Sequence, residues 1–219
     1  MSLILFSVPC IKFPKGASLM QRISIRIVSF FTLIAIASLC AFTAIQNESP
    51  GESMAKMLKL GNELATPNEN HLFLEKLTGH WETTSSIMGM PSEKGTAQHK
   101  MIFGNRFLEG TLTGTFMGVK YTSRGIVGYD NYKKKFIGVT FDTLGTSMRT
   151  SEGILDQSKT TLSLWGTMDE WMTDEHDKPV MYRYNIIDDD HFDLEIHDLG
   201  IVPGDTRVIT IQFVRTSDR

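Results

Sequence analysis

A two-residue alternation of apolar and polar side chains begins at Trp81 and recurs in short stretches over the rest of the chain. The odd positions of one such stretch are Ala97, His99, Met101 and Phe103. Successive side chains of a β-strand point to opposite faces of the sheet, so this period predicts strands. The stretches are separated by Gly, Asn and Asp residues that favour turns.

About ten strands are predicted in this way, with no helix-length segment between them. They are 81–88, 97–103, 107–116, 119–129, 136–142, 147–155, 160–167, 179–187, 191–197 and 206–215. Short turns between neighbouring strands favour antiparallel, up-and-down order. Closure into a barrel removes the exposed edges of such a sheet, and a barrel of this size leaves interior space. The predicted fold class is therefore an all-β antiparallel barrel, preceded by short N-terminal helices. The acidic segment 168–178 is predicted as a loop.

Before Trp81 the apolar spacing fits helices. Ser53 is a candidate N-cap for a first helix whose apolar side chains include Met54 and Met57. Pro67 ends this segment, and Asn68 or Asn70 can cap a second short helix that Gly79 stops. We expect the first helix to cover an open end of the barrel; a helix that binds a partner or a membrane surface is the alternative.

The N-terminal segment has the pattern of an export signal. Arg22 and Arg26 precede an apolar run at residues 27–45, which is close to the roughly 20 residues that a spanning helix needs. A cleaved signal and an uncleaved anchor are both open, and the start codon is Met1 or Met20. The predicted organisation is a signal peptide or membrane anchor at 1–46, a linker and short helix at 47–70, and a barrel domain at 71–219.

Charge and cysteine content exclude several functions. Residues 1–47 contain four basic residues and no acidic one, which leaves 18 basic and 25 acidic residues beyond them, a net charge of −7. A region with this net negative charge repels the phosphate backbone of nucleic acids, so no nucleic acid partner is expected. Both cysteines, Cys10 and Cys40, lie in the N-terminal segment, so the body has no disulfide and no thiolate ligand.

The candidate ligand-binding residues are polar or soft side chains whose position in a strand places them near the barrel interior. A few polar groups suffice to orient a ligand in a mostly apolar pocket. His99 is also a candidate general base or haem ligand, or a core histidine with a hydrogen-bonded partner. Glu152 is expected either in the cavity or paired with Arg149 or Arg124. The full set is His99, Tyr121, Met148, Glu152, Tyr182 and Tyr184.

No metal site, cofactor or catalytic residue is predicted. Two acidic segments, 174–177 and 188–191, contain metal-competent side chains but lack the spacing of a zinc or calcium site. The sequence contains no nucleophile-elbow, phosphate-loop or dinucleotide-binding motif.

Several stretches resemble the bacterial domain-of-unknown-function 1579 family. They cover roughly residues 72 to 215 and are 74–81, 103–108, 128–136, 142–146, 151–153 and 187–192. The family implies no activity and no catalytic residue, and it is similar to the calycins, the lipocalin-like barrels. That similarity implies that Gly79 and Trp81 open the first strand and that Arg215 from the last strand covers the indole, closing one end of the barrel through a cation–π contact worth about 0.5–2 kcal/mol.

The sequence thus predicts an exported, non-enzymatic barrel that binds a small, mostly apolar ligand. Its membrane contact is expected only through the N-terminal segment, if that segment is uncleaved. Two alternatives stay open: an enzyme that uses His99 and Glu152 as acid–base groups in the cavity, and an envelope-associated structural or interaction protein.

Overall fold

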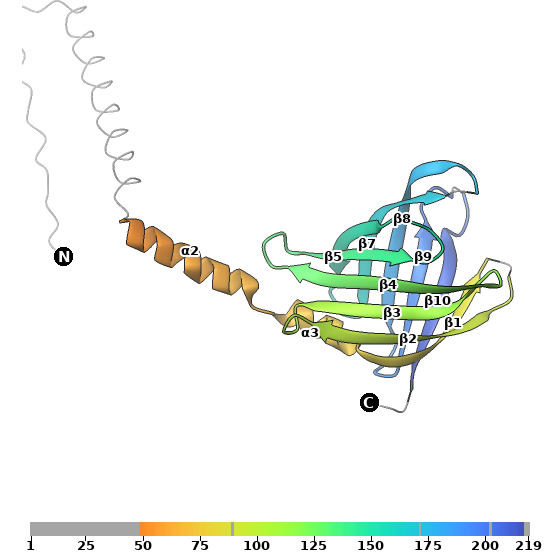
Figure 1. The fold of residues 1–219 in the computed structure, drawn as a ribbon, viewed down its shortest axis with the longest axis horizontal. Coiled ribbons are helices and arrows are strands. Elements are labelled where there is room, and N and C mark those ends of the chain that lie inside the picture. The colour runs from red at the N-terminus through yellow and green to blue at the C-terminus, as the bar shows by residue number, and fades with distance from the viewer. Residues whose placement is uncertain (1–48, 89, 171, 202, 217–219) are drawn as a thin grey trace, which may run out of the picture. The chain divides into compact units, whose positions relative to one another are not determined.

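The computed structural model describes residues 49–216 except 89, 171 and 202 (Figure 1). The described residues divide into two units between Leu60 and Gly61. The predicted signal or anchor lies outside the described residues. Within them, no helix combines the length and the hydropathy needed to cross a membrane.

Helix α2 spans Pro50–Ala65 and begins earlier than the sequence suggested. The cap is Ser49, not Ser53: its hydroxyl accepts from the Glu52 amide at 3.3 Å, and the Glu52 carboxylate accepts from the Ser49 amide at 3.0 Å. This reciprocal pair satisfies amides at the free end of the helix, and proline is tolerated at the first helical position. No residue of α2 is buried, and the predicted covering role of this helix stays a prediction.

Helix α3 spans Glu69–Lys76, and its N-cap is Asn68, one of the two candidates. The Asn68 side chain accepts from the Asn70 amide, and the His71 ring accepts from the Asn68 amide at 3.0 Å. Phe73 and Leu74 are buried with at most 3% of their surface exposed. A helix this short is unstable alone, so packing of these side chains onto the barrel holds it in place.

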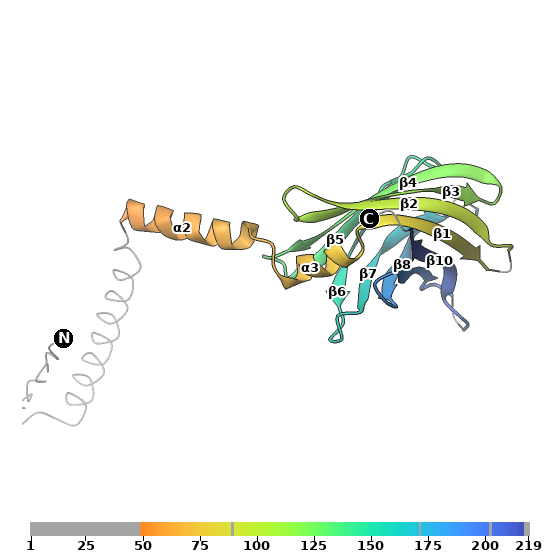
Figure 2. The same ribbon diagram turned by 90° about the horizontal axis from the view of Figure 1, so that it is seen from below.

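Ten antiparallel strands follow and form a closed barrel in which neighbours in sequence are neighbours in the sheet (Figures 1 and 2). The strands are β1 (Gly79–Ile87), β2 (Glu93–Ile102), β3 (Phe107–Phe116), β4 (Val119–Asp130), β5 (Lys135–Asp142), β6 (Arg149–Leu155), β7 (Thr161–Glu170), β8 (Glu175–Ile186), β9 (His191–Asp198) and β10 (Arg207–Arg215). Strand β10 pairs with β1 from Trp81↔Arg215 to Ile87↔Ile209, which closes the wall. The predicted fold class is confirmed.

Three predicted boundaries need correction. Strand β2 begins at Glu93, within the expected turn, because Lys94 and Gly95 pair with Thr84 and Thr83 of β1. Phe103 leaves the strand: it lies in a turn with φ of 50° and is 76% exposed.

The acidic segment 168–178 is the third correction, because most of it is a hairpin extension and not a loop. Met168 pairs with Lys178 and Glu170 pairs with Glu175, with a register shift between the two pairs. Charged residues fit these positions because their side chains are largely exposed.

The two ends of the barrel differ in packing. One end, here called the closed end, carries α3 and the turns 103–106, 131–134, 156–160 and 187–190. Inside it Trp81, Phe136, Phe192 and Phe213 are buried with at most 3% exposure. The opposite end, here called the open end, carries the turns after β1, β3, β5, β7 and β9.

Candidate ligand cavity

A contact between the first and last strands fixes the closed end. The Arg215 guanidinium carbon lies 4.0 Å from the centre of the Trp81 ring, and Arg215 donates to the carbonyls of Thr78, Lys76 and Asp189. A Cβ at Gly79 would collide with Arg215 Nη1, and Gly79 has φ of 127°, so only glycine fits there. These are the contacts that the calycin resemblance implies for Gly79, Trp81 and Arg215.

His99 belongs to this aromatic cluster. Its Nδ1 donates to the Leu77 carbonyl at 3.0 Å, and the Trp81 Nε1 donates to the same carbonyl at 3.2 Å. Its ring centre lies 5.6 Å from that of Phe213. Burial lowers the pKa of His99 to about 4, against the effect of the Leu77 hydrogen bond, so the ring is neutral near pH 7.

The inward-facing apolar side chains are covered to different extents. Some are almost completely buried, from Phe192 at the closed end to Val180 toward the open end. Others are only partly buried along the whole length of the wall; they are Met101, Leu112, Tyr129, Leu155, Tyr182, Tyr184, Ile186, Leu194 and Ile209. The apolar surface that Leu112 and Ile209 leave uncovered beyond the aromatic cluster is the basis for the hollow that is proposed below.

A polar arc crosses the wall of this hollow, formed by Ser85, Tyr121, Asp142, Arg149 and Tyr182. Asp142 and Arg149 form an ion pair with side chains 13% and 23% exposed. The Tyr182 side chain hydrogen-bonds Arg149, and the Tyr121 side chain hydrogen-bonds Ser85. Burial raises the pKa of both tyrosines, and the Asp142 carboxylate adds to this effect, which places the two phenols on either side of one carboxylate.

Tyr184 lies deeper than the polar arc. Burial raises its pKa to about 12, with a further contribution from Tyr182, so its phenol stays protonated. Nearer the β1–β2 side, the buried hydroxyl of Thr83 has no hydrogen-bond partner among the described residues. An unpaired buried hydroxyl costs free energy unless a ligand or water pairs with it.

Two of the six predicted ligand-binding residues are placed outside the cavity, which corrects their assignment. Glu152 lies on the outer face of β6, and its carboxylate accepts from Lys135 Nζ at 2.6 Å. The inward positions of this strand are odd-numbered, as buried Gly153 shows, so an even-numbered residue faces solvent. Met148 lies in the turn before β6 and is 65% exposed. The other four, His99, Tyr121, Tyr182 and Tyr184, lie inside the barrel.

Sequence reasoning missed the ion pair of Asp142 with Arg149. Asp142 ends one predicted strand and Arg149 stands near the start of the next, where charged side chains are commonly exposed, and Arg149 was considered only as a partner of Glu152. The signal was the alternation itself, because Arg149 shares its parity with Gly153 and Asp142 shares its parity with buried Phe136.

The acidic segments considered for metal binding form local hydrogen bonds instead. The Asp188 carboxylate bonds His191 Nδ1 at 2.7 Å and the Asp190 amide at 2.8 Å within one turn. Within the described residues, no group of three or more His, Cys, Asp or Glu side chains is arranged to hold a metal ion.

These features define a closed ten-strand β-barrel with one end plugged by aromatic side chains and several inward-facing apolar side chains that are only partly buried. The chain belongs to the family described as Protein of unknown function (DUF1579), whose model matches residues 66–215. No curated protein is similar enough in sequence to match the chain.

Several solved barrels resemble the chain. The S-type phycobiliprotein lyase CPES from Guillardia theta is 11% identical, with coverage of 68% of this chain and 94% of the lyase and a TM-score of 0.42. A de novo designed fluorescence-activating beta barrel is 11% identical, with coverage of 65% of this chain and 96% of the designed chain and a TM-score of 0.39. A redesigned barrel, mFAP0, bound to DFHBI, is 12% identical, with coverage of 64% and 99% and a TM-score of 0.36.

Proposed function

We propose that this protein binds a small, mostly apolar molecule in the open half of its barrel. The observation that supports this most directly is the incomplete burial of inward-facing apolar side chains such as Leu112 and Leu194. Apolar surface left uncovered inside a barrel forgoes contacts that a ligand of matching shape would supply. Mostly apolar walls with few polar groups are typical of small-molecule sites.

The polar arc sets the chemistry of one end of the ligand. Arg149 is neutralised by Asp142, so the site favours an uncharged hydrogen-bonding group, such as a hydroxyl, carbonyl or amide, over a carboxylate. The phenols of Tyr121 and Tyr182 can donate to such a group. The unpaired Thr83 hydroxyl is a further polar position on the wall.

The acid–base alternative lacks the geometry it requires. His99 lies inside the closed end, whereas the Glu152 carboxylate is on the outer face and bonded to Lys135. The strand wall separates the two side chains, so they cannot act on one bound molecule.

Binding can be tested by filling the hollow. Leu112→Trp combined with Leu194→Trp should weaken binding of a fluorescent apolar probe to the full-length chain at least tenfold, since two indoles would occupy the space. Ile154→Trp is the matched control, because Ile154 is 56% exposed and faces outward. Unchanged affinity in the filled variant, measured by fluorescence titration, would contradict the proposed site.

Export is the second part of the proposal. It is supported by the basic residues Arg22 and Arg26 directly before the apolar run at 27–45. Cell fractionation followed by N-terminal sequencing of the mature chain tests it. A chain found in the cytosol with its N-terminus intact would contradict export.

A further inference from the structure

The mouth of the barrel carries a set of exposed apolar side chains. Closed-end residues such as Phe103 and Tyr132 are exposed too, but their turns also contain charged residues. The side chains at the mouth come from the open-end turns after β1, β3 and β5 and the first residue of β4, and their exposed fractions range from 42% for Met90 to 65% for Met148. We name this set the apolar rim; it consists of Met88, Met90, Met117, Val119, Leu144 and Met148. Strands β1 to β6 are consecutive neighbours in the barrel, so the rim covers one continuous side of the mouth.

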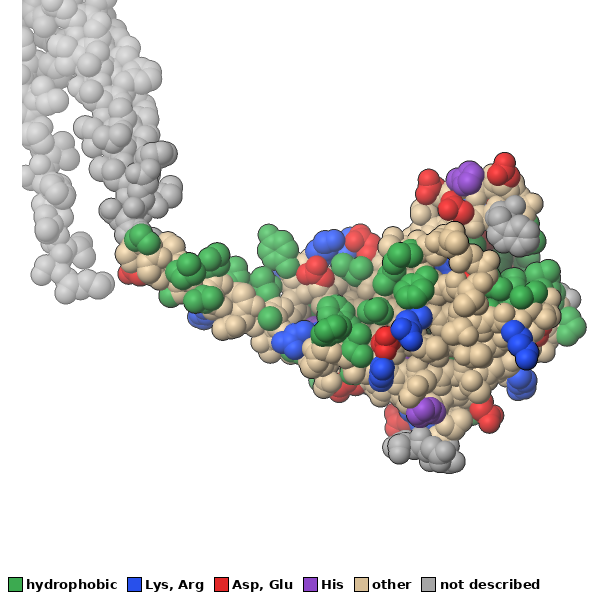
Figure 3. Space-filling view, in the orientation of Figure 1, with side chains coloured by type: hydrophobic (Ala, Val, Ile, Leu, Met, Phe, Trp, Pro, Cys, Tyr) green, Lys and Arg blue, Asp and Glu red, His purple; other side chains and the backbone are tan. Residues whose placement is uncertain are grey.

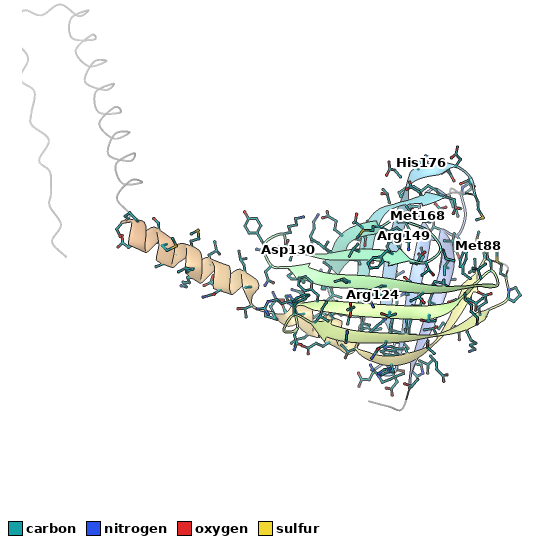
Figure 4. The ribbon with its side chains drawn as sticks, in the orientation of Figure 1. Met88, Arg124, Asp130, Arg149, Met168 and His176 are labelled. Carbon is teal, nitrogen blue, oxygen red and sulfur yellow. The ribbon has the colours of Figure 1, made fainter. Side chains whose placement is uncertain are left out.

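The rim is also free of charge. The three turns, 88–92, 117–118 and 143–148, contain no charged residue in the sequence, whereas each of the four closed-end turns contains at least one. Figure 4 labels one residue near each end of the barrel. Met88 lies at the end away from Asp130, and Asp130 directly precedes a closed-end turn. Figure 3 shows hydrophobic side chains gathered at that end, where Figure 1 places the turns after β1 and β3.

The opposite side of the mouth is acidic. The β7–β8 hairpin carries Asp169, Glu170, Asp174 and Glu175, and His176 of this hairpin stands apart from Met88 in Figure 4. The mouth therefore has one apolar side and one strongly hydrated side. Such a surface can sit tilted on an apolar phase with the acidic hairpin in water.

Two lysines follow the rim on strands β2 and β4. Lys94 is the second residue of β2 and Lys120 directly follows Val119, and both side chains are exposed. The apolar rim side chains lie farthest out on this end of the barrel, and the lysine ammonium groups lie behind them. This order matches the order of acyl chains and phosphates at a bilayer surface.

The composition of the rim favours lipid over a protein partner. Protein interfaces are typically anchored by Trp, Tyr and Arg, and none of the six rim residues is of these types. Methionine is flexible and adapts to an irregular apolar environment, which suits fluid acyl chains. The rim also borders one side of the opening of the proposed cavity, so an apolar molecule could pass between bilayer and barrel on that side without crossing water.

We propose that the apolar rim inserts into the surface of a phospholipid membrane, with Lys94 and Lys120 at the level of the phosphates, and that the cavity takes up its ligand from the bilayer. Contact with the membrane is inferred from the apolar rim alone, whereas uptake of the ligand rests on the proposed function. The contact is made by the barrel itself and is distinct from any anchoring by the N-terminal run.

The test uses the full-length chain with Cys10→Ser and Cys40→Ser and one polarity-sensitive fluorophore on a new cysteine. Met117→Cys and Met148→Cys report on the mouth, and Tyr132→Cys, in a closed-end turn, is the matched control. With phosphatidylcholine vesicles we expect emission at both mouth positions to rise at least twofold and to be quenched by brominated lipid, with no change at position 132. Insertion of the N-terminal run would hold all three labels near the same bilayer, so the comparison between ends is unaffected.

Charge variants complete the experiment. Lys94→Glu with Lys120→Glu should reduce the Met117→Cys signal severalfold, whereas Lys133→Glu with Lys134→Glu at the closed end should leave it unchanged. Val119→Asp with Met148→Asp should slow transfer of an apolar probe from vesicles to protein about tenfold and leave probe affinity in solution unaltered. If the probe fails to bind in solution while the mouth labels still insert, the proposed function fails and the membrane contact stands.

Two results would overturn the inference. Equal signals at both ends of the barrel would show that the rim has no special affinity for lipid. A rise in emission with protein concentration in the absence of vesicles would assign the rim to a second copy of the chain.

Discussion

The closed and open ends of this barrel are built from the same ten strands but differ in which side chains occupy the interior. At the closed end, Trp81, Phe192 and Phe213 fill the barrel, with ring centres of Phe192 and Phe213 4.1 Å apart in a stacked arrangement. At the open end, tyrosines and an ion pair line a hollow. Stability is concentrated where packing is complete, which leaves the other end free to carry a ligand without unfolding the protein.

The largest expected effect follows from this difference in packing. Trp81→Ala should lower the free energy of unfolding by about 4 kcal/mol, because it removes a buried indole and its hydrogen bond to Leu77. Leu194→Ala, in the middle of β9, should cost about 1–2 kcal/mol, since its side chain is only partly buried. Urea unfolding followed by circular dichroism measures both, and equal losses would contradict a division into a packed and a hollow half.

A pH-dependent effect is also expected from His99 at the closed end. The pKa of His99 is about 4 in the folded protein, below the ordinary histidine value of 6.5 that applies to the unfolded chain. The unfolded chain binds the additional proton, so stability is full above pH 6.5 and falls as the pH drops toward 4, by about 3 kcal/mol in total.

His99→Gln should remove most of this loss when unfolding free energies are compared at pH 7 and pH 4.5. His71 retains a smaller loss of the same sign, because burial lowers its pKa too. His176→Gln is the control, since this ring is exposed in the β7–β8 hairpin. An unchanged pH profile in the His99 variant would show that its ring is not the group protonated.

The smallest of the three effects concerns the pair that closes the barrel. Arg215→Met should cost about 2 kcal/mol, because it removes the cation–π contact and leaves the carbonyls of Thr78 and Lys76 without their donor. Arg207→Met in the same strand should change stability by less than Arg215→Met does, since the Arg207 side chain is about half exposed and Glu195 keeps His197 as a second partner. Thermal unfolding of both variants tests this; similar shifts would indicate that closure does not depend on Arg215.

The fold was largely predictable from the sequence because every strand of a barrel repeats the same two-residue alternation and ends at turn residues. Alternation and turn residues located all ten strands, and Asn68 was among the predicted caps. The exceptions were local: Phe103 continued the alternation of its strand, but its chain turns there with positive φ. The acidic extension of β7 and β8 was missed because exposed strand residues carry no apolar period.

The site was less predictable, since it depends on which face of a strand is inside. A shift of one residue exchanges the two faces, and Glu152 and Met148 were placed on the wrong one. Tyr121, Tyr182 and Tyr184 followed the correct parity. The pairing of Asp142 with Arg149 joins two strands across a turn; the alternation places both side chains on the inner face, but it does not show that they are partners.

The bond between Arg215 and Thr78 joins residues 137 positions apart. Strand β1 therefore has an unpaired edge during synthesis until β10 has emerged, and the barrel acquires its native seam only in its final step of assembly. Shortening the chain before β10 would leave two open sheet edges that are prone to aggregation.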